Sequence, residues 1–140
     1  MSGERVDTIK ERAAAFLGLA RELVDRGRLD IASFNVHQAC QLRIKASVLR
    51  LLGEMPRIHS IRELLGVLAK VLEELDYIEA SGRVVDFARG NREILIDIES
   101  AYTESRYGLC AATRRSVDMM IRVAEDLFSL LEEVEESVLG

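Results

Sequence analysis

The sequence predicts an all-α protein, an up-and-down bundle of four to five helices. Apolar residues recur at every third or fourth position through most of the chain, and no segment alternates like a β-strand. The 140 residues contain a single proline, Pro56, and no glycine-, serine- and proline-rich stretch that could link two domains. Since 49% of the residues are hydrophobic, we expect residues 1–140 to form one domain around one core.

The first two helices are expected to form an antiparallel hairpin. Residues 4–26 have apolar side chains at helical spacing, and Gly27 ends this segment. Asp30 is the expected N-cap of a second helix over residues 31–52, which ends at Gly53. This second helix is apolar around most of its circumference, so we expect it at the centre of the bundle, packed on one side against the core and on the other against a further element or a second subunit.

A third helix is expected to begin at His59 or Ser60, because the apolar residues that follow fall on one helical face. Glu63 would lie in its first turn, where a carboxylate interacts favourably with the helix dipole. Ser81 and Gly82 are expected to end this helix.

Two more helices are expected in the last third of the chain. Asp86 is a possible N-cap for a helix that runs through Tyr102, although Gly90 weakens its beginning. Gly108 then breaks the pattern, and a last amphipathic helix covers residues 112–138. The short connections between these helices favour antiparallel neighbours.

The charge distribution is uneven along the chain. A net charge of −5 argues against non-specific binding of nucleic acid over the whole surface. Between Arg43 and Arg62, however, five basic residues accompany one acidic residue, Glu54, whereas every charged residue after Arg122 is acidic. The basic segment is interpreted either as a local anion site or as a solvated helix surface.

Several classes of site are not predicted. Cys40 and Cys110 are too few for a disulfide framework and too far apart for a metal clip, so we interpret them as reduced, half-buried thiols. The sequence has no phosphate-binding glycine loop and no histidine–carboxylate spacing typical of a metal site, so we predict no metal and no cofactor. It also shows no apolar run long enough for a secretory signal or membrane span, and we expect a cytoplasmic protein without membrane contact.

Gln38 and Lys45 are the most unusual residues of the second helix because, seven positions apart, they share an arc that is otherwise apolar. Polar groups in such a place must find partners or reach water. One interpretation is a cleft in which Lys45 offers a positive charge and Gln38 an amide to an anionic ligand. The other is a lysine that extends to solvent and a glutamine that a neighbouring helix or subunit satisfies.

Three further residues could contribute to such a site. His59 follows the proline loop at a helix start, where free backbone N–H groups could hold a phosphate, or it could cap that helix. Arg106 and Tyr107 offer a cation and an aromatic face to a nucleotide, unless the arginine pairs with a nearby glutamate and the tyrosine packs in the bundle. His37 is interpreted as a satisfied, partly buried histidine on the other side of the second helix.

Two segments, residues 34–65 and 100–108, carry a recognisable pattern. The first reads F-x-x-x-Q-A-x-x-x-x-x-K-A, then a proline loop, then His-Ser-Ile-x-x-Leu-Leu, and the second contains Ser-Arg-Tyr. In this order and spacing, the chain resembles the HEPN domain (higher eukaryotes and prokaryotes nucleotide-binding). The resemblance spans nearly the whole chain and implies an up-and-down helical bundle, commonly a homodimer, that binds nucleotides.

The resemblance also implies something about catalysis. Many HEPN relatives are metal-independent ribonucleases that use an Arg-x(4–6)-His motif at the dimer interface. Here Arg106 is followed by Tyr-Gly-Leu-Cys-Ala-Ala-Thr-Arg, without a histidine at a suitable position, and Gly108 replaces the usual proline after Arg-Tyr. The chain therefore resembles the non-catalytic members that accompany a separate minimal nucleotidyltransferase in toxin–antitoxin-like pairs.

These observations favour a homodimeric binding domain over an enzyme. We expect it to bind a nucleotide, a minimal nucleotidyltransferase partner, or both. The alternatives are an RNase of atypical site composition and a purely structural dimeric helical adaptor. The candidate ligand-binding residues are Lys45, Gln38, His59, Arg106 and Tyr107.

Overall fold

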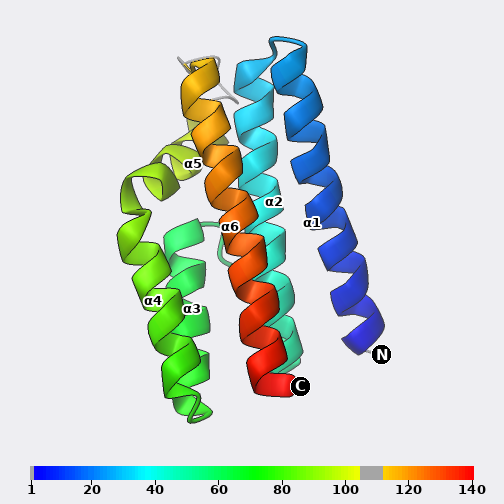
Figure 1. Ribbon diagram of the computed structural model, residues 1–140. Helices are drawn as coiled ribbons and strands as arrows, with labels where there is room; N and C mark the ends of the chain where they lie inside the picture. Colours follow the sequence, from blue (N-terminus) through cyan, green and yellow to red (C-terminus); the bar gives the residue numbers. More distant parts are fainter. Residues whose placement is uncertain (1, 105–111) are drawn as a thin grey trace.

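The computed structural model describes residues 2–104 and 112–140, and in this part of the chain it contains six α-helices and no strand (Figure 1). The all-α class expected from the sequence is confirmed. The helices are α1 (Ser2–Asp25), α2 (Leu29–Leu52), α3 (Ile61–Glu74), α4 (Ile78–Gly90), α5 (Arg92–Glu104) and α6 (Arg114–Leu139).

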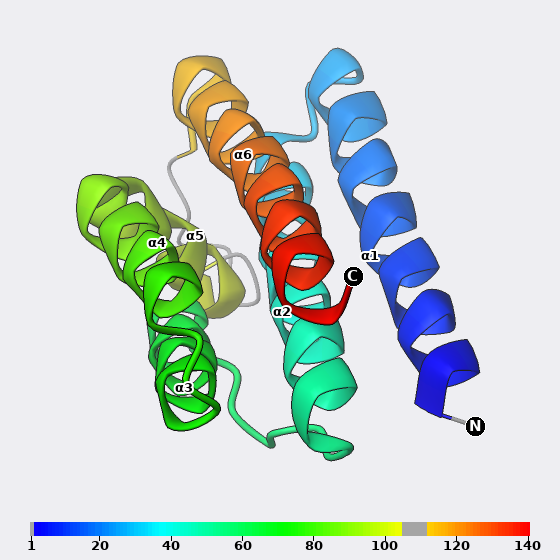
Figure 2. The same cartoon turned by 60° about the horizontal axis from the view of Figure 1, so that its bottom comes forward.

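The helices are arranged around α2 and α6, the two long helices in the middle of the molecule. α1 lies along one edge and packs mainly against α2, whereas α3, α4 and α5 cover the opposite side (Figures 1 and 2). The N-terminus and the C-terminus lie at the same end of the bundle (Figure 1). Every helix contacts α2 or α6, so these two helices organise the core.

α2 has the central position that its apolar composition predicts. Nearly all of its side chains from Ala32 to Leu49 are buried, including fully buried Cys40 and Ile44. Burial raises the pKa of the Cys40 thiol to about 12, so the expected half-buried thiol is instead an inert core residue. Cys110 lies outside the described residues.

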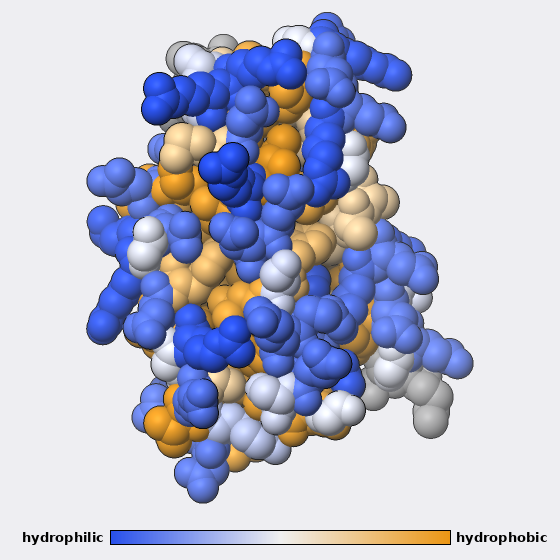
Figure 3. Space-filling model, in the orientation of Figure 1, coloured by the Kyte–Doolittle hydropathy of each residue, from blue (hydrophilic) through white to orange (hydrophobic). Residues whose placement is uncertain are grey.

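The side of the bundle shown in Figure 3 is largely hydrophilic, with apolar patches between the rows of polar side chains.

The start of α2 differs from expectation, while its end agrees. The N-cap is Arg28, which makes no side-chain capping bond, and Asp30 lies within the first turn. An aspartate there still interacts favourably with the helix dipole, so its presence near a helix start does not identify the cap. Gly53 ends the helix in the left-handed conformation (φ 77°), and its N–H donates to the Leu49 carbonyl at 2.7 Å.

The expected break at Ser81 and Gly82 is wrong, because both residues lie inside α4. α3 ends at Glu74, and the chain turns at Asp76, which adopts a positive φ of 72°. Aspartate tolerates this conformation better than most residues, so it can make the turn without a glycine. The Ser81 hydroxyl is buried and donates to the Ala69 carbonyl at 2.7 Å, which ties α4 to α3.

The helix expected from Asp86 to Tyr102 is divided at Asn91, and Asp86 itself lies within α4. Asn91 serves both neighbours: its Nδ2 donates to the Phe87 carbonyl of α4 at 3.0 Å, and its own carbonyl accepts from the Leu95 N–H of α5 at 2.9 Å. One short polar residue therefore makes a junction that periodicity alone does not reveal.

Residues 53–60, here called the return loop, connect α2 to α3 by running back along α2. The loop ends beside the middle of α2, where the His59 carbonyl lies 3.1 Å from His37 Nε2. About 22 Å of helix separates Leu52 from His37, at 1.5 Å per residue. The return loop therefore runs back along the C-terminal half of α2. As a result, α3 runs in the same direction as α2 (Figure 1).

A buried ion pair joins α2 to α6. Arg43 Nη2 lies 2.8 Å from Glu135 Oε2 and 2.8 Å from Glu132 Oε2, and only 3% of the Arg43 side chain and 2% of the Glu135 side chain are exposed. Ser47 Oγ accepts from Arg43 Nη1 at 2.9 Å and donates to Glu135 Oε2 at 2.8 Å. These four residues form one connected network with satisfied polar atoms.

Two more cations complete this Glu135 cluster. Lys10 of α1 lies 2.9 Å and Arg50 of α2 lies 3.0 Å from Glu135 Oε1. Burial alone would raise the pKa of Glu135, but the charge of Arg43 and the hydrogen bonds from Lys10, Ser47 and Arg43 outweigh it and lower the pKa to about 2. The cluster thus holds α1, α2 and α6 together through one ionised carboxylate.

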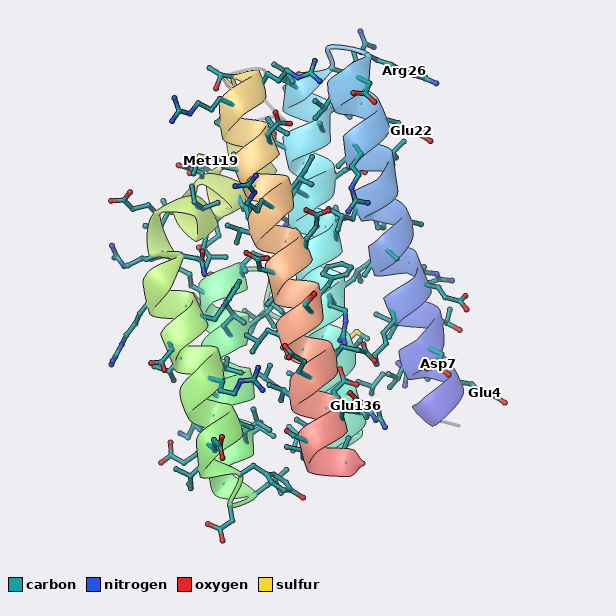
Figure 4. The ribbon with its side chains drawn as sticks, viewed as in Figure 1. Glu4, Asp7, Glu22, Arg26, Met119 and Glu136 are labelled. Atoms are coloured by element: carbon teal, nitrogen blue, oxygen red, sulfur yellow. The ribbon has the colours of Figure 1, made fainter. Side chains whose placement is uncertain are left out.

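We predict that Glu135→Gln lowers the free energy of unfolding by about 3 kcal/mol, because Arg43 then lacks its buried counter-charge. Urea denaturation at neutral pH measures this change. Glu136→Gln is the matched control: Glu136 is exposed on the neighbouring position of α6 (Figure 4), and its variant should remain within about 0.5 kcal/mol of wild type.

The same pair of proteins tests the charge of Glu135. A carboxyl whose pKa is lowered by folding stabilises the fold above its unfolded pKa, and this contribution is lost as the pH falls through the folded pKa. The stability difference between wild type and Glu135→Gln should therefore shrink between pH 4.5 and about 2. Equal stability losses in the Glu135 and Glu136 variants would contradict the role of the cluster.

Candidate anion-binding site

Gln38, Gln41 and Lys45 form a polar row on α2, because positions three and four apart in a helix lie above one another. Lys45 Nζ donates to Gln41 Oε1 at 2.9 Å, and Gln41 Nε2 lies 3.4 Å from Gln38 Oε1. Gln41 and Lys45 are each 7% exposed, and Gln38 is half-buried. Gln38 is therefore the member of the row nearest the surface.

The return loop brings His59 to this row. His59 Nδ1 lies 2.9 Å from Gln41 Oε1, the atom that also accepts from Lys45. Because an ammonium can only donate, the Gln41 atom between them must be the carbonyl oxygen, and His59 Nδ1 must therefore carry a proton. His37 holds the backbone of the same residue, through Nε2 and the His59 carbonyl at 3.1 Å. His59 is thus fixed by both its ring and its carbonyl.

Lys45 differs electrostatically from Arg43, two residues earlier. Arg43 faces two carboxylates, whereas no salt bridge to Lys45 is present among residues 2–104 and 112–140. Burial disfavours the charged form and lowers the pKa of the Lys45 amine. The site therefore contains a desolvated positive charge that is hydrogen-bonded to a neutral group, the Gln41 amide.

A second group of polar side chains borders His59. Ser60 Oγ donates to Glu99 Oε1 of α5 at 2.7 Å, and Arg62 Nε lies 2.5 Å from Glu99 Oε2.

The pKa of His37 is lowered, because the effect of burial is larger than the opposing effects. Those opposing effects, which raise the pKa, are the hydrogen bonds to Gln38 and to the His59 carbonyl and the charge of Glu99. Because the His59 carbonyl can only accept, His37 Nε2 donates to it, in keeping with its role in fixing the loop.

The structure brings together three of the five candidate residues expected from the sequence: Lys45, Gln38 and His59. Arg106 and Tyr107 lie outside the described residues. His59 does not cap α3, because Ser60 occupies the N-cap and accepts from the Glu63 N–H at 3.4 Å. His37 is buried and hydrogen-bonded, as expected.

Sequence reasoning missed Gln41, the residue that joins Lys45 to His59. Its position between Gln38 and Lys45 on the same helical face was the available signal. It also missed Glu99, whose contact with Ser60 depends on how α5 packs against the return loop.

The basic segment from 43 to 62 does not form one site, because Arg43 and Arg50 join the Glu135 cluster while Lys45 faces the return loop.

Other kinds of site find no support in the described part of the chain. No group of three or more histidine, cysteine, aspartate or glutamate side chains there could hold a metal ion. Among the helices described, none combines the length and apolar character needed to cross a membrane.

Comparison with known proteins identifies the family. The family model for the HEPN domain matches residues 6–134, so it covers α1 to nearly the end of α6. No curated protein matches the chain. The chain belongs to the HEPN domain family.

We predict that Lys45→Met leaves the free energy of unfolding unchanged or raises it by about 1 kcal/mol, because methionine fills a similar volume without a desolvated charge. Lys70→Met, on an exposed position of α3, is the control and should resemble wild type. Urea denaturation measures both.

The gain should decrease in alkaline solution. A lysine whose pKa is lowered by folding destabilises the protein below that pKa, and the penalty disappears as the pH rises towards the ordinary value of 10.5. A clear loss of stability in Lys45→Met at neutral pH would show instead that Lys45 serves the fold.

Proposed function

We propose that this HEPN domain binds a nucleotide, or a related phosphate-bearing ligand, through Lys45, Gln38 and His59. Gln41 would position the lysine and the histidine relative to each other. Arg106 and Tyr107 remain candidates for the phosphate and the base, because in the sequence they follow directly after α5, whose Glu99 borders the site.

The environment of Lys45 carries the proposal. Its amine is buried, it bonds to an amide oxygen rather than to a carboxylate, and a histidine ring shares that oxygen. Hydrogen bonds to charged groups are worth about 1.5–3 kcal/mol, so a phosphate beside this ammonium would gain affinity that a neutral ligand would not. The side-chain amide of Gln38 would supply both a donor and an acceptor for the neutral part of the ligand.

Isothermal titration with ATP, GTP, CTP and UTP tests this proposal. We expect saturable binding of at least one nucleotide, and we expect Lys45→Met to weaken it about tenfold or more, the loss of one charge-assisted hydrogen bond. Lys70→Met is the matched control and should bind as wild type does. Absence of heat at millimolar nucleotide, or equal binding by Lys45→Met, would contradict the proposal.

We also propose that the chain is a homodimer and the non-catalytic partner of a minimal nucleotidyltransferase, in a toxin–antitoxin-like pair. This part is supported by the sequence alone: the Ser-Arg-Tyr segment is present, and no histidine follows Arg106 at the spacing of the ribonuclease motif. A cytoplasmic location is consistent with such a role. If the chain binds no ligand, the remaining alternative is a purely structural dimeric adaptor.

One observation favours a second candidate function, an RNase with an atypical site. His59 and Lys45 meet at the same oxygen of Gln41, so an imidazole and an ammonium lie close enough to serve one phosphate. These groups are suited to move protons and stabilise negative charge during phosphodiester cleavage without a metal.

Incubation of the purified protein with labelled RNA decides between the two functions. If the site is catalytic, His59→Ala should reduce cleavage by at least about 100-fold, the usual contribution of a general acid or base. Cleavage that His59→Ala leaves unchanged would come from another site or from a contaminant and would exclude this candidate.

A further inference from the structure

An apolar groove lies between α3 and α4, away from the Lys45 site. It has a volume of about 290 Å³. Leu65, Ala69 and Val84 are buried beneath it, and Gly66 is exposed along one side. Val85 and Ala88 of α4, both half-buried, complete its apolar lining. This α3–α4 groove is small for a binding pocket, since ligand sites commonly have volumes from about 300 Å³ upwards.

The polar residues that line the groove are all arginines. Arg62 lies in the first turn of α3, Arg89 in the last turn of α4, and Arg92 at the start of α5. Because α3 and α4 form a tight antiparallel hairpin, the beginning of α3 and the end of α4 lie at the same end of the groove. No acidic residue lines the groove, although the whole chain carries a charge of −5.

The opposite end of the groove is limited by the Ser81 hydroxyl, which donates to the Ala69 carbonyl and holds the two helices together. From Arg62 to Ala69 the groove extends over seven residues of α3, or about 10 Å. Arg62 Nε donates to Glu99 Oε2, while the side chains of Arg89 and Arg92 make no hydrogen bond or ion pair within residues 2–104 and 112–140. The groove thus has a cationic end and an apolar end.

We infer that the α3–α4 groove binds a small amphipathic anion, with its carboxylate or phosphate at the arginines and an apolar body about 10 Å long between α3 and α4. Charge complementarity selects an anionic head, because three guanidinium groups line that end and, among the described residues, only that of Arg62 is paired with a carboxylate, Glu99. The short length and the limited volume select a small molecule, because a helix of a partner protein is about 10–12 Å across and would exceed the groove.

Titration of ¹⁵N-labelled full-length protein with octanoate, octyl phosphate and neutral 1-octanol tests this inference by NMR. We expect saturable shifts of backbone amide signals in residues 62–69 and 84–92. The two anionic probes distinguish carboxylate from phosphate recognition. Shifts that do not saturate, or that lie elsewhere on the protein, would overturn the inference.

Two variants make the test specific. A Cβ at Gly66 meets no atom within 4 Å, so Gly66→Leu can fill the groove without displacing the helix, and it should abolish the shifts. Gly82→Leu is the matched control, because Gly82 is also helical with open space at Cβ but does not line the groove. Octanoate binding retained by Gly66→Leu, or lost equally in both variants, would overturn the inference.

The arginines are tested separately. Arg89→Gln with Arg92→Gln should weaken octanoate binding about tenfold and leave 1-octanol binding unchanged, because only the anion uses the guanidinium groups. Arg83→Gln, outside the groove and paired with Glu133, is the control. Equal octanoate affinity in the double variant and wild type would exclude an anion at this end.

Discussion

The ion pair between Arg43 and Glu135 fixes the rotation of α2 about its own axis, and both polar regions of the bundle depend on that rotation. Arg43 must face α6 to reach Glu135, because either charge without the other would be buried at a high cost. Lys45 is two residues further along the helix, about 200° around it. When Arg43 points to α6, Lys45 is therefore directed to the return loop.

The two buried cations of α2, Arg43 and Lys45, illustrate different solutions to the problem of burying a charge. Arg43 is neutralised by two carboxylates, and a hydroxyl completes its hydrogen bonds, which is the pattern of a residue that serves the fold. Lys45 is also buried but has an amide oxygen as its partner. Stability alone favours an apolar residue at such a position, and this is the observation on which the proposed anionic ligand rests.

The sequence predicts the class of the fold well because the helical spacing of apolar residues reports directly on burial, most clearly in α3 and α6. Boundaries were harder to predict where one polar residue makes the turn. Asp76 turns the chain after α3 without a glycine or proline, Asn91 follows Gly90 and separates α4 from α5, and Ser81-Gly82 resembles a break but lies within α4. The deciding features are a backbone conformation, a local side-chain hydrogen bond and a tertiary contact, and the apolar periodicity encodes none of them.

The residues of the candidate site could likewise be predicted only in part from the sequence. Lys45 and Gln38 could be recognised because they interrupt an apolar face, and His59 because it follows a loop. Gln41 could not be ranked above other polar residues without knowing that the return loop brings His59 back to the middle of α2. Glu99 required the packing of α5 against that loop. Periodicity places residues on a helical face, but it does not say which distant segment will meet them.

The return loop also has a consequence for how this domain can change over evolution. The loop has two tasks, because it joins α2 to α3 and also carries His59 back to the middle of α2. Extra residues would add slack that a surface loop readily accommodates. Deletions would shorten the reach of the chain and draw His59 away from His37 and Gln41 before they disturb the packing of the helices. The minimum length of this loop is therefore set by the geometry of the site as well as by the bundle.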